Sequence, residues 1–193
     1  ALARDAASRG RKTVGPDDVI EAFREQTGLP EAFLRDDTLL GREELRAHFA
    51  RRIIGQGAAV ERVADVALTY KAGLNDRNRP ISTMVLAGPT GVGKTATARA
   101  LADYFFGAGQ RSNPLVRVDM SEFQHPAQIE RFIGSPGGEP GRLLQEVREK
   151  PFLVLLLDEI EKAHPAFFDA LMTVLDEGLL LDAYGRVTDF RNA

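Results

Sequence analysis

Apolar residues recur with helical spacing along much of the chain. In 94–106 they fall at i, i+3, i+4 and i+7, which places four of them on one helix face: Ala98, Leu101, Ala102 and Phe105. The same spacing predicts helices over 42–52, 58–74, 126–132, 142–149 and 165–176. We expect the inward faces of the first and last of these to carry Leu45, Phe49 and Ile53, and Phe168, Leu171 and Leu175.

The chain before residue 40 has a different character. Residues 1–8 are rich in Ala and prone to form a helix, and a second helix is expected to start at Pro16, with acids in its first turn. Its apolar stripe would be Val19, Ala22 and Phe23, and residues 27–30 would end it. Residues 28–41 combine Gly, Pro and paired Asp, which predicts a linker. We therefore divide the chain into 1–40 and 41–193.

Short apolar runs predict strands between the helices. They cover 83–87, 115–119 and 152–157, and residues 179–188 have the pattern of a hairpin. Because these strands alternate with helices, the expected fold class is α/β, with a three-layer parallel sheet.

Composition narrows the possible functions. The 193 residues carry a net charge of −3, with acids and bases mixed along the chain. The sequence has no basic stripe of the kind that would indicate a nucleic-acid partner. No apolar run approaches the ~18 residues of a membrane span, so we expect no membrane partner. The chain has no cysteine, which favours a reducing cytoplasm. It begins at Ala1 rather than Met and stops at Ala193 without a terminating pattern, so we interpret it as a piece of something longer.

The first chemical motif follows the predicted strand 83–87. Residues 88–95 read Gly-Pro-Thr-Gly-Val-Gly-Lys-Thr, the G-x-x-x-x-G-K-[ST] pattern of a phosphate-binding loop. Its glycines let backbone N–H groups close on a polyanion, and the following helix points its positive end at the same place. Lys94 would reach the β- and γ-phosphates, and the Thr95 hydroxyl would hold Mg²⁺. A chance Gly-rich turn is the alternative, which the preceding strand and following helix disfavour.

The second motif ends the apolar strand 152–157. Asp158 and Glu159 would stand at the carboxyl edge of the sheet, with the strand buried on both faces. Asp158 would support Mg²⁺ through a bound water, and Glu159 would orient and deprotonate the attacking water. Alternatively the two acids only cap the next helix. The phosphate-binding loop about 60 residues earlier favours the catalytic interpretation, and the lack of an Asn-Lys-x-Asp element favours ATP over GTP.

Taken together, the motifs resemble one family. The loop 88–95, Asp-Met-Ser-Glu-Phe at 119–123, the acidic run 158–165 and residues 175–178 are similar to the second ATPase module of Clp-type AAA+ unfoldases and disaggregases. So are Ile-Gly-Gln at 54–56 and the stretch 185–192, so the resemblance runs over about 13–193. Residues 27–30 look like the end of the connector between two such modules, with 1–12 as the tail of the preceding module.

The resemblance implies properties that spacing does not. Members assemble into hexameric rings and use ATP to pull polypeptide through a central pore. Asp158 and Glu159 match the metal-supporting and hydrolytic acids, and the backbone around Ile53 and Ile54 matches the stretch that reads adenine. The resulting nucleotide-binding set is Ile53, Ile54, Gly88, Pro89, Thr90, Gly91, Val92, Gly93, Lys94, Thr95 and Ala96. Its ligands would be ATP and Mg²⁺, its partners a polypeptide substrate and identical subunits; any peptidase or adaptor is unidentified.

Two departures keep alternatives open. The family's aromatic pore loop is missing from 133–141, which is short and Gly-rich, so either the grip on substrate is absent or a stretch of chain is missing here. The chain also stops before the polar sensor strand, the arginine finger and the helical lid. We therefore expect this piece alone to hydrolyse ATP poorly. The rival functions are an AAA+ scaffold that threads nothing and a DNA-acting loader.

Overall fold

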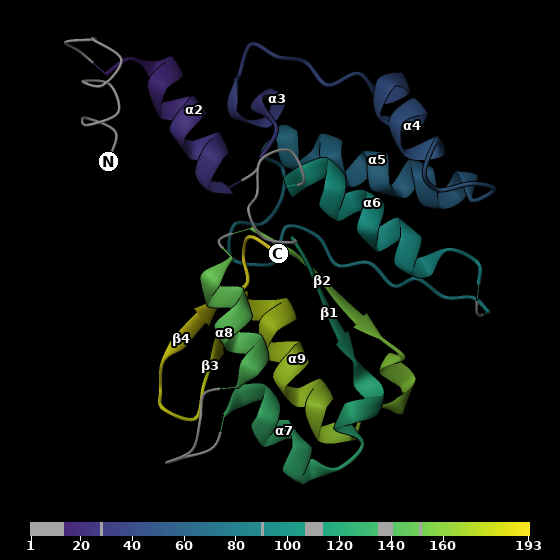
Figure 1. The fold of residues 1–193 in the computed structure, drawn as a ribbon, viewed down its shortest axis with the longest axis vertical. Helices are drawn as coiled ribbons and strands as arrows, with labels where there is room; N and C mark the ends of the chain where they lie inside the picture. Colours follow the sequence, from purple (N-terminus) through teal and green to yellow (C-terminus); the bar gives the residue numbers. More distant parts are fainter. Residues whose placement is uncertain (1–13, 28, 90, 107–113, 135–140, 151) are drawn as a thin grey trace.

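A computed structural model describes residues 14–27, 29–89, 91–106, 114–134, 141–150 and 152–193 of the chain. Figure 1 shows two halves, with α2 to α6 gathered above and the strands with α7 to α9 below. Each half has its own apolar cluster: one around Phe49, Val63 and Phe105, the other around Met120, Leu144 and Phe167. The expected helix at 1–8 and the connection 107–113 lie outside the described residues.

The first half consists of five helices within the described residues. They are α2 (Pro16–Thr27), α3 (Glu31–Leu34), α4 (Arg42–Ala50), α5 (Gly57–Lys71) and α6 (Lys94–Phe106). The predicted inward residues of α4 and its end are confirmed, because Leu45, Phe49 and Ile53 are buried. The predicted face of α6 is confirmed as well: Ala98, Ala102 and Phe105 are buried and Leu101 packs against the same cluster.

Two expectations about the segment before residue 40 are wrong. The stretch 28–41 is not a plain linker, since it contains α3, whose Phe33 stacks on Phe105 with ring centroids 5.1 Å apart. On α2, Val19 and Phe23 are 46% and 41% exposed rather than buried. Phe23 covers only the rim of the cluster, meeting Phe152 edge-on at 6.1 Å. The boundary near residue 40 stays a prediction.

The second half is built on two parallel strands. β1 (Leu115–Asp119) pairs with β2 (Val154–Asp158), and the register places Asp119 opposite Asp158. The predicted hairpin is confirmed as β3 (Leu179–Leu181) and β4 (Val187–Asp189), which pair antiparallel. The helical elements of this half are η1 (Met120–Phe123), α7 (Pro126–Ile133), α8 (Arg142–Glu149), η2 (Ile160–Lys162) and α9 (Pro165–Glu177).

The strand expected before the phosphate-binding loop is wrong in this structure. Residues 83–87 form no ladder, and Val85 is 88% exposed. The segment instead borders α5 across a cavity of about 370 Å³, which Arg62, Asp65 and Thr69 line from the helix side. With β1 as its one neighbour among the described strands, β2 is half-buried along its length rather than covered on both faces. The three-layer sheet therefore stays an expectation.

The inward face of α9 also differs from the prediction. Phe167 and Val174 are buried, whereas Phe168 is 39% exposed and Leu171 and Leu175 are only partly covered. Phe167 packs edge-on against Phe132 at 4.8 Å, which joins α9 to α7. The face is shifted by one residue because Phe167 and Phe168 are adjacent and either could begin the apolar repeat.

A buried carboxylate fixes the hairpin to α8. Asp182, with a fully buried side chain, accepts hydrogen bonds from Arg148 Nη2 and Arg186 Nε at 2.8 Å and from the backbone N–H groups of Tyr184 and Arg186 at 2.9 Å. Burial acts to raise the pKa of Asp182, but these donors outweigh burial and hold the pKa well below its usual range. No helix within the described ranges is long and apolar enough to cross a membrane.

Candidate nucleotide-binding site

The phosphate-binding loop is folded around its own lysine. Lys94 is the first residue of α6, and its Nζ donates to the carbonyl oxygens of Gly88 and Pro89 at 2.7 and 3.0 Å. Gly91 and Gly93 have φ of +86° and +100°, a conformation that glycine adopts without strain. Thr90 lies outside the described residues. The loop thus brings its lysine back over its own backbone at the start of a helix.

The charge at this loop is not neutralised locally. Among the described residues, no carboxylate oxygen lies within 4.0 Å of the Lys94 ammonium. The 13-residue helix α6 adds the partial positive charge of its N-terminus at the same point. A cation and a helix N-terminus together favour an anion with several oxygens. The residues present therefore fit a triphosphate.

A neighbouring turn is tied to the loop. Gln56 Nε2 donates to the carbonyl oxygen of Val92 at 3.2 Å, which links the α4–α5 connection to the loop. In that connection Ile53 is buried at 3% exposure, whereas Ile54 is 84% exposed. The structure thus brings the expected adenine-reading turn and the phosphate-binding loop together, through a residue outside the predicted set.

The acids stand at the carboxyl ends of both parallel strands. Asp158 ends β2, and its side chain is 19% exposed and forms an ion pair with Arg117 Nη2 at 2.7 Å. Opposite it, the Asp119 carboxylate accepts from the backbone N–H and the hydroxyl of Ser121 at 3.0 and 2.6 Å. These two hydrogen bonds lower the pKa of Asp119. The Asp119 carboxylate is thus hydrogen-bonded by the hydroxyl and N–H of Ser121, whereas the Asp158 carboxylate is paired with the side chain of Arg117.

Glu159 has an unusual backbone conformation. Its φ of 56° and ψ of 41° are left-handed, and among the described residues it is the one non-glycine with positive φ. Such conformations carry strain and cluster at functional sites. The carboxylate pairs with Lys162 Nζ at 2.6 Å and makes no capping hydrogen bond to η2, and this pairing raises the pKa of Lys162. The capping alternative therefore has no support in the Glu159 side chain.

The strands and α6 bring the two motifs onto one framework. Val154 of β2 packs against the cluster that contains Ala100 and Phe105 of α6. In Figure 1 the N-terminal end of α6 and the arrowheads of β1 and β2 all lie on the right of the view. Sequence reasoning missed Arg117 and Lys162; a basic residue two positions before Asp119 and another three after Glu159 were the available signals.

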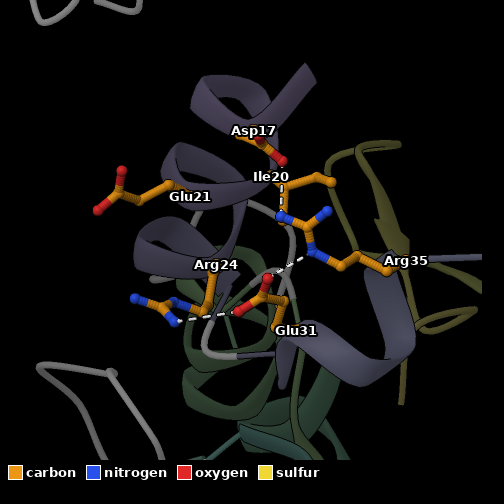
Figure 2. Close-up of a pocket in the computed structure, with 6 residues that line it drawn as sticks. All are labelled: Asp17, Ile20, Glu21, Arg24, Glu31 and Arg35. Carbon is orange, nitrogen blue, oxygen red and sulfur yellow. Dashed lines mark hydrogen bonds and ion pairs between the residues drawn. The ribbon is translucent and has the colours of Figure 1, made fainter. Parts of the chain in front are cut away.

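A separate cavity lies between α2 and α3, and most of the charged side chains that line it are paired with one another. It holds about 200 Å³, and Figure 2 shows Asp17, Arg24, Glu31 and Arg35 turned toward one another, whereas Glu21 points away from them. Arg35 pairs with Glu31 and, at 2.6 Å, with Asp17, while Arg24 lies 3.9 Å from Glu31. The two arginines balance the charges of Asp17 and Glu31, and Glu21 adds one further negative charge to the lining. Within the described ranges no cluster of three or more His, Asp or Glu side chains could hold a metal by itself.

Comparison with known proteins identifies the class. The model of the AAA domain family (Cdc48 subfamily) matches residues 79–193, and the chain belongs to this family. Its core is therefore a P-loop AAA+ fold, and the nucleotide-binding character expected from the loop follows.

The relatives narrow this class to the Clp type. The chain is 43% identical over 187 residues to the chaperone protein ClpB of Mycobacterium tuberculosis (strain ATCC 25618 / H37Rv), which covers 94% of the chain and 22% of that protein. It is 43% identical over 181 residues to ClpB of Aquifex aeolicus (91% and 18%), and 40% identical over 201 residues to ClpB of Propionibacterium freudenreichii (100% and 23%). The Clp-type resemblance is thus confirmed, and the chain spans about a fifth of the length of these curated relatives.

Proposed function

We propose that this chain is the ATP-binding and hydrolysing core of a protein-remodelling chaperone that works as a hexameric ring in the cytoplasm and threads polypeptides. The observation that carries the proposal is the Lys94 ammonium at the start of α6, which no described carboxylate neutralises. The helix it opens packs on β2, the strand that ends in Asp158. The relatives are named as chaperones, which favours remodelling over the scaffold and DNA-loader alternatives.

Each side chain has a distinct part in this proposal. Lys94 would leave the carbonyl oxygens of Gly88 and Pro89 and donate to the β- and γ-phosphate oxygens. Thr95 and Asp158 would hold Mg²⁺, which supplies charge neutralisation at the phosphates. Glu159 would leave Lys162, orient the attacking water and accept its proton. The turn at Ile53 and Ile54, tied to the loop by Gln56, would carry the adenine.

Two substitutions in the full-length protein separate binding from chemistry. Lys94→Ala removes the phosphate contact, so ATP affinity should fall by about tenfold or more. Glu159→Gln keeps the shape of the side chain but removes the general base. ATP binding should therefore persist while turnover falls by about 10²–10⁴-fold. ATP binding is measured by fluorescence titration and turnover by phosphate release.

The matched control is Glu161→Gln. It removes the same charge from an exposed side chain that lies two residues after Glu159. It should leave both binding and turnover within about twofold of the parent protein. Parental turnover in Glu159→Gln would reject Glu159 as the water-activating acid, and parental affinity in Lys94→Ala would reject the loop as the phosphate site.

A further inference from the structure

The residue that holds the metal-supporting acid is an arginine from the neighbouring strand. In the register of β1 and β2, Arg117 lies opposite Leu156, two positions before the facing pair Asp119 and Asp158. Residues two apart on a strand share a face, and diagonal partners lie within reach of a long side chain. Arg117 therefore spans the ladder diagonally, and its Nη2 meets the Asp158 carboxylate at 2.7 Å.

Of the two facing carboxylates, Arg117 forms its direct ion pair with Asp158, and its charge also acts on Asp119. Asp119 is on the same strand as Arg117, but its carboxylate already accepts two hydrogen bonds from Ser121. Asp158 has no such local donor among the described residues, and its side chain is only 19% exposed, so a bare carboxylate there would be poorly solvated. Arg117 is 56% exposed and keeps one end in water. A solvent-facing cation thus compensates a largely covered acid.

We propose that Arg117 is a positioning residue that competes with Mg²⁺ for Asp158. This inference rests on the proposed function, in which Asp158 supports the metal. In the structure Arg117 holds the Asp158 carboxylate, and Arg117 would have to release or share that carboxylate for Asp158 to support Mg²⁺.

The size of the effect follows from the exposure of the pair. A partly exposed ion pair that the metal must displace raises the half-saturating Mg²⁺ concentration by about threefold to tenfold. Metal-free nucleotide contacts the loop rather than Asp158, so its affinity should change by less than about twofold when Arg117 is replaced. The diagnostic result is a change in Mg²⁺ affinity without a matching change in the affinity for metal-free nucleotide. A general loss of structure would weaken both.

The test uses Arg117→Gln in the full-length protein, with a fluorescent ATP analogue as the probe. Its dissociation constant is measured in EDTA, and Mg²⁺ is then titrated at fixed nucleotide. The half-saturating Mg²⁺ concentration should fall by about threefold to tenfold in Arg117→Gln and by a smaller factor in Arg117→Lys, which keeps the charge on a different geometry. Arg62→Gln, which removes the same charge from an exposed position of α5, should not move it.

Each outcome has one meaning. An unchanged or increased half-saturating Mg²⁺ concentration in Arg117→Gln overturns the role of Arg117 while leaving nucleotide binding by Lys94 intact. Equal shifts in Arg117→Gln and Arg62→Gln would assign the effect to net charge and also overturn it. If the parent protein binds the analogue with no dependence on Mg²⁺, the assignment of Asp158 in the proposed function fails together with this inference.

Discussion

The adjacent residues Phe167 and Phe168 provide a stability test of the packing beneath the acidic edge. Phe167 is fully buried and lies against Phe132 at 4.8 Å and Phe123 at 6.1 Å, whereas Phe168 is 39% exposed. Both are replaced by Ala, one at a time. The two variants make the same chemical change at neighbouring positions of one helix, so they differ only in what each ring contacts.

The expected difference follows from burial. Removing a fully buried Phe loses its transfer free energy and leaves a cavity, which together cost about 3–5 kcal/mol of unfolding free energy. Phe168 lies at the surface, where water can fill the space, so its loss should cost about 1–2 kcal/mol. A gap of about 2 kcal/mol shifts Tm by about 4–8 °C in a chain of this size.

Urea denaturation followed by circular dichroism measures both unfolding free energies on the same scale. The structure predicts that Phe167→Ala is the more destabilised variant, with the m-value unchanged. A larger loss in Phe168→Ala would show that α9 buries the face predicted from its sequence. Equal losses would contradict the preferential burial of Phe167.

Two further predictions concern the hairpin and Gly178, the residue that directly precedes β3. Because the folded-state pKa of Asp182 is depressed, its stabilisation is present above about pH 4 and is lost as the pH falls toward the lower folded pKa. Asp182→Asn should therefore flatten the loss of unfolding free energy between about pH 5 and pH 2 in urea titrations; an unchanged slope would contradict this. Gly178 has φ of +65°, and a Cβ there would lie 2.7 Å from the Asn78 carbonyl oxygen, so Gly178→Ala should lower stability by about 2–4 kcal/mol. Gly185→Ala, with φ of +74° and no atom within 4 Å of the added Cβ, should cost about 1–2 kcal/mol. Urea denaturation of both glycine variants measures the two losses, and equal losses would refute the steric argument.

The sequence predicted those features that depend on residues close together in the chain, such as the bounds of single helices and strands. The bounds of α6 and β1 match the expectation, because the apolar period of 94–106 and the short apolar stretch that begins at Leu115 determine them. The phosphate-binding loop was readable because its glycines and lysine have fixed spacing. The curled position of Lys94 over Gly88 and Pro89 was not, since it is a property of the folded loop.

The failures arise where partners far apart in sequence decide the outcome. An apolar run such as 83–87 does not specify the ladder it joins, and here it lies beside α5 with Val85 exposed. The ion pair between Arg117 and Asp158 depends on the register of β1 against β2, which the composition of neither strand reveals. The left-handed backbone of Glu159 likewise becomes visible only in the folded turn.

In the proposed function, Lys94 and the acids at the end of β2 act on the same triphosphate. A crystal structure of the full-length protein with Mg²⁺ and a non-hydrolysable ATP analogue would show whether they do. We expect Lys94 Nζ within hydrogen-bond distance of the β- and γ-phosphate oxygens, with Asp158 beside the metal and Glu159 facing the γ-phosphate. A nucleotide bound with the Asp158 and Glu159 carboxylates on another face of the domain would contradict it.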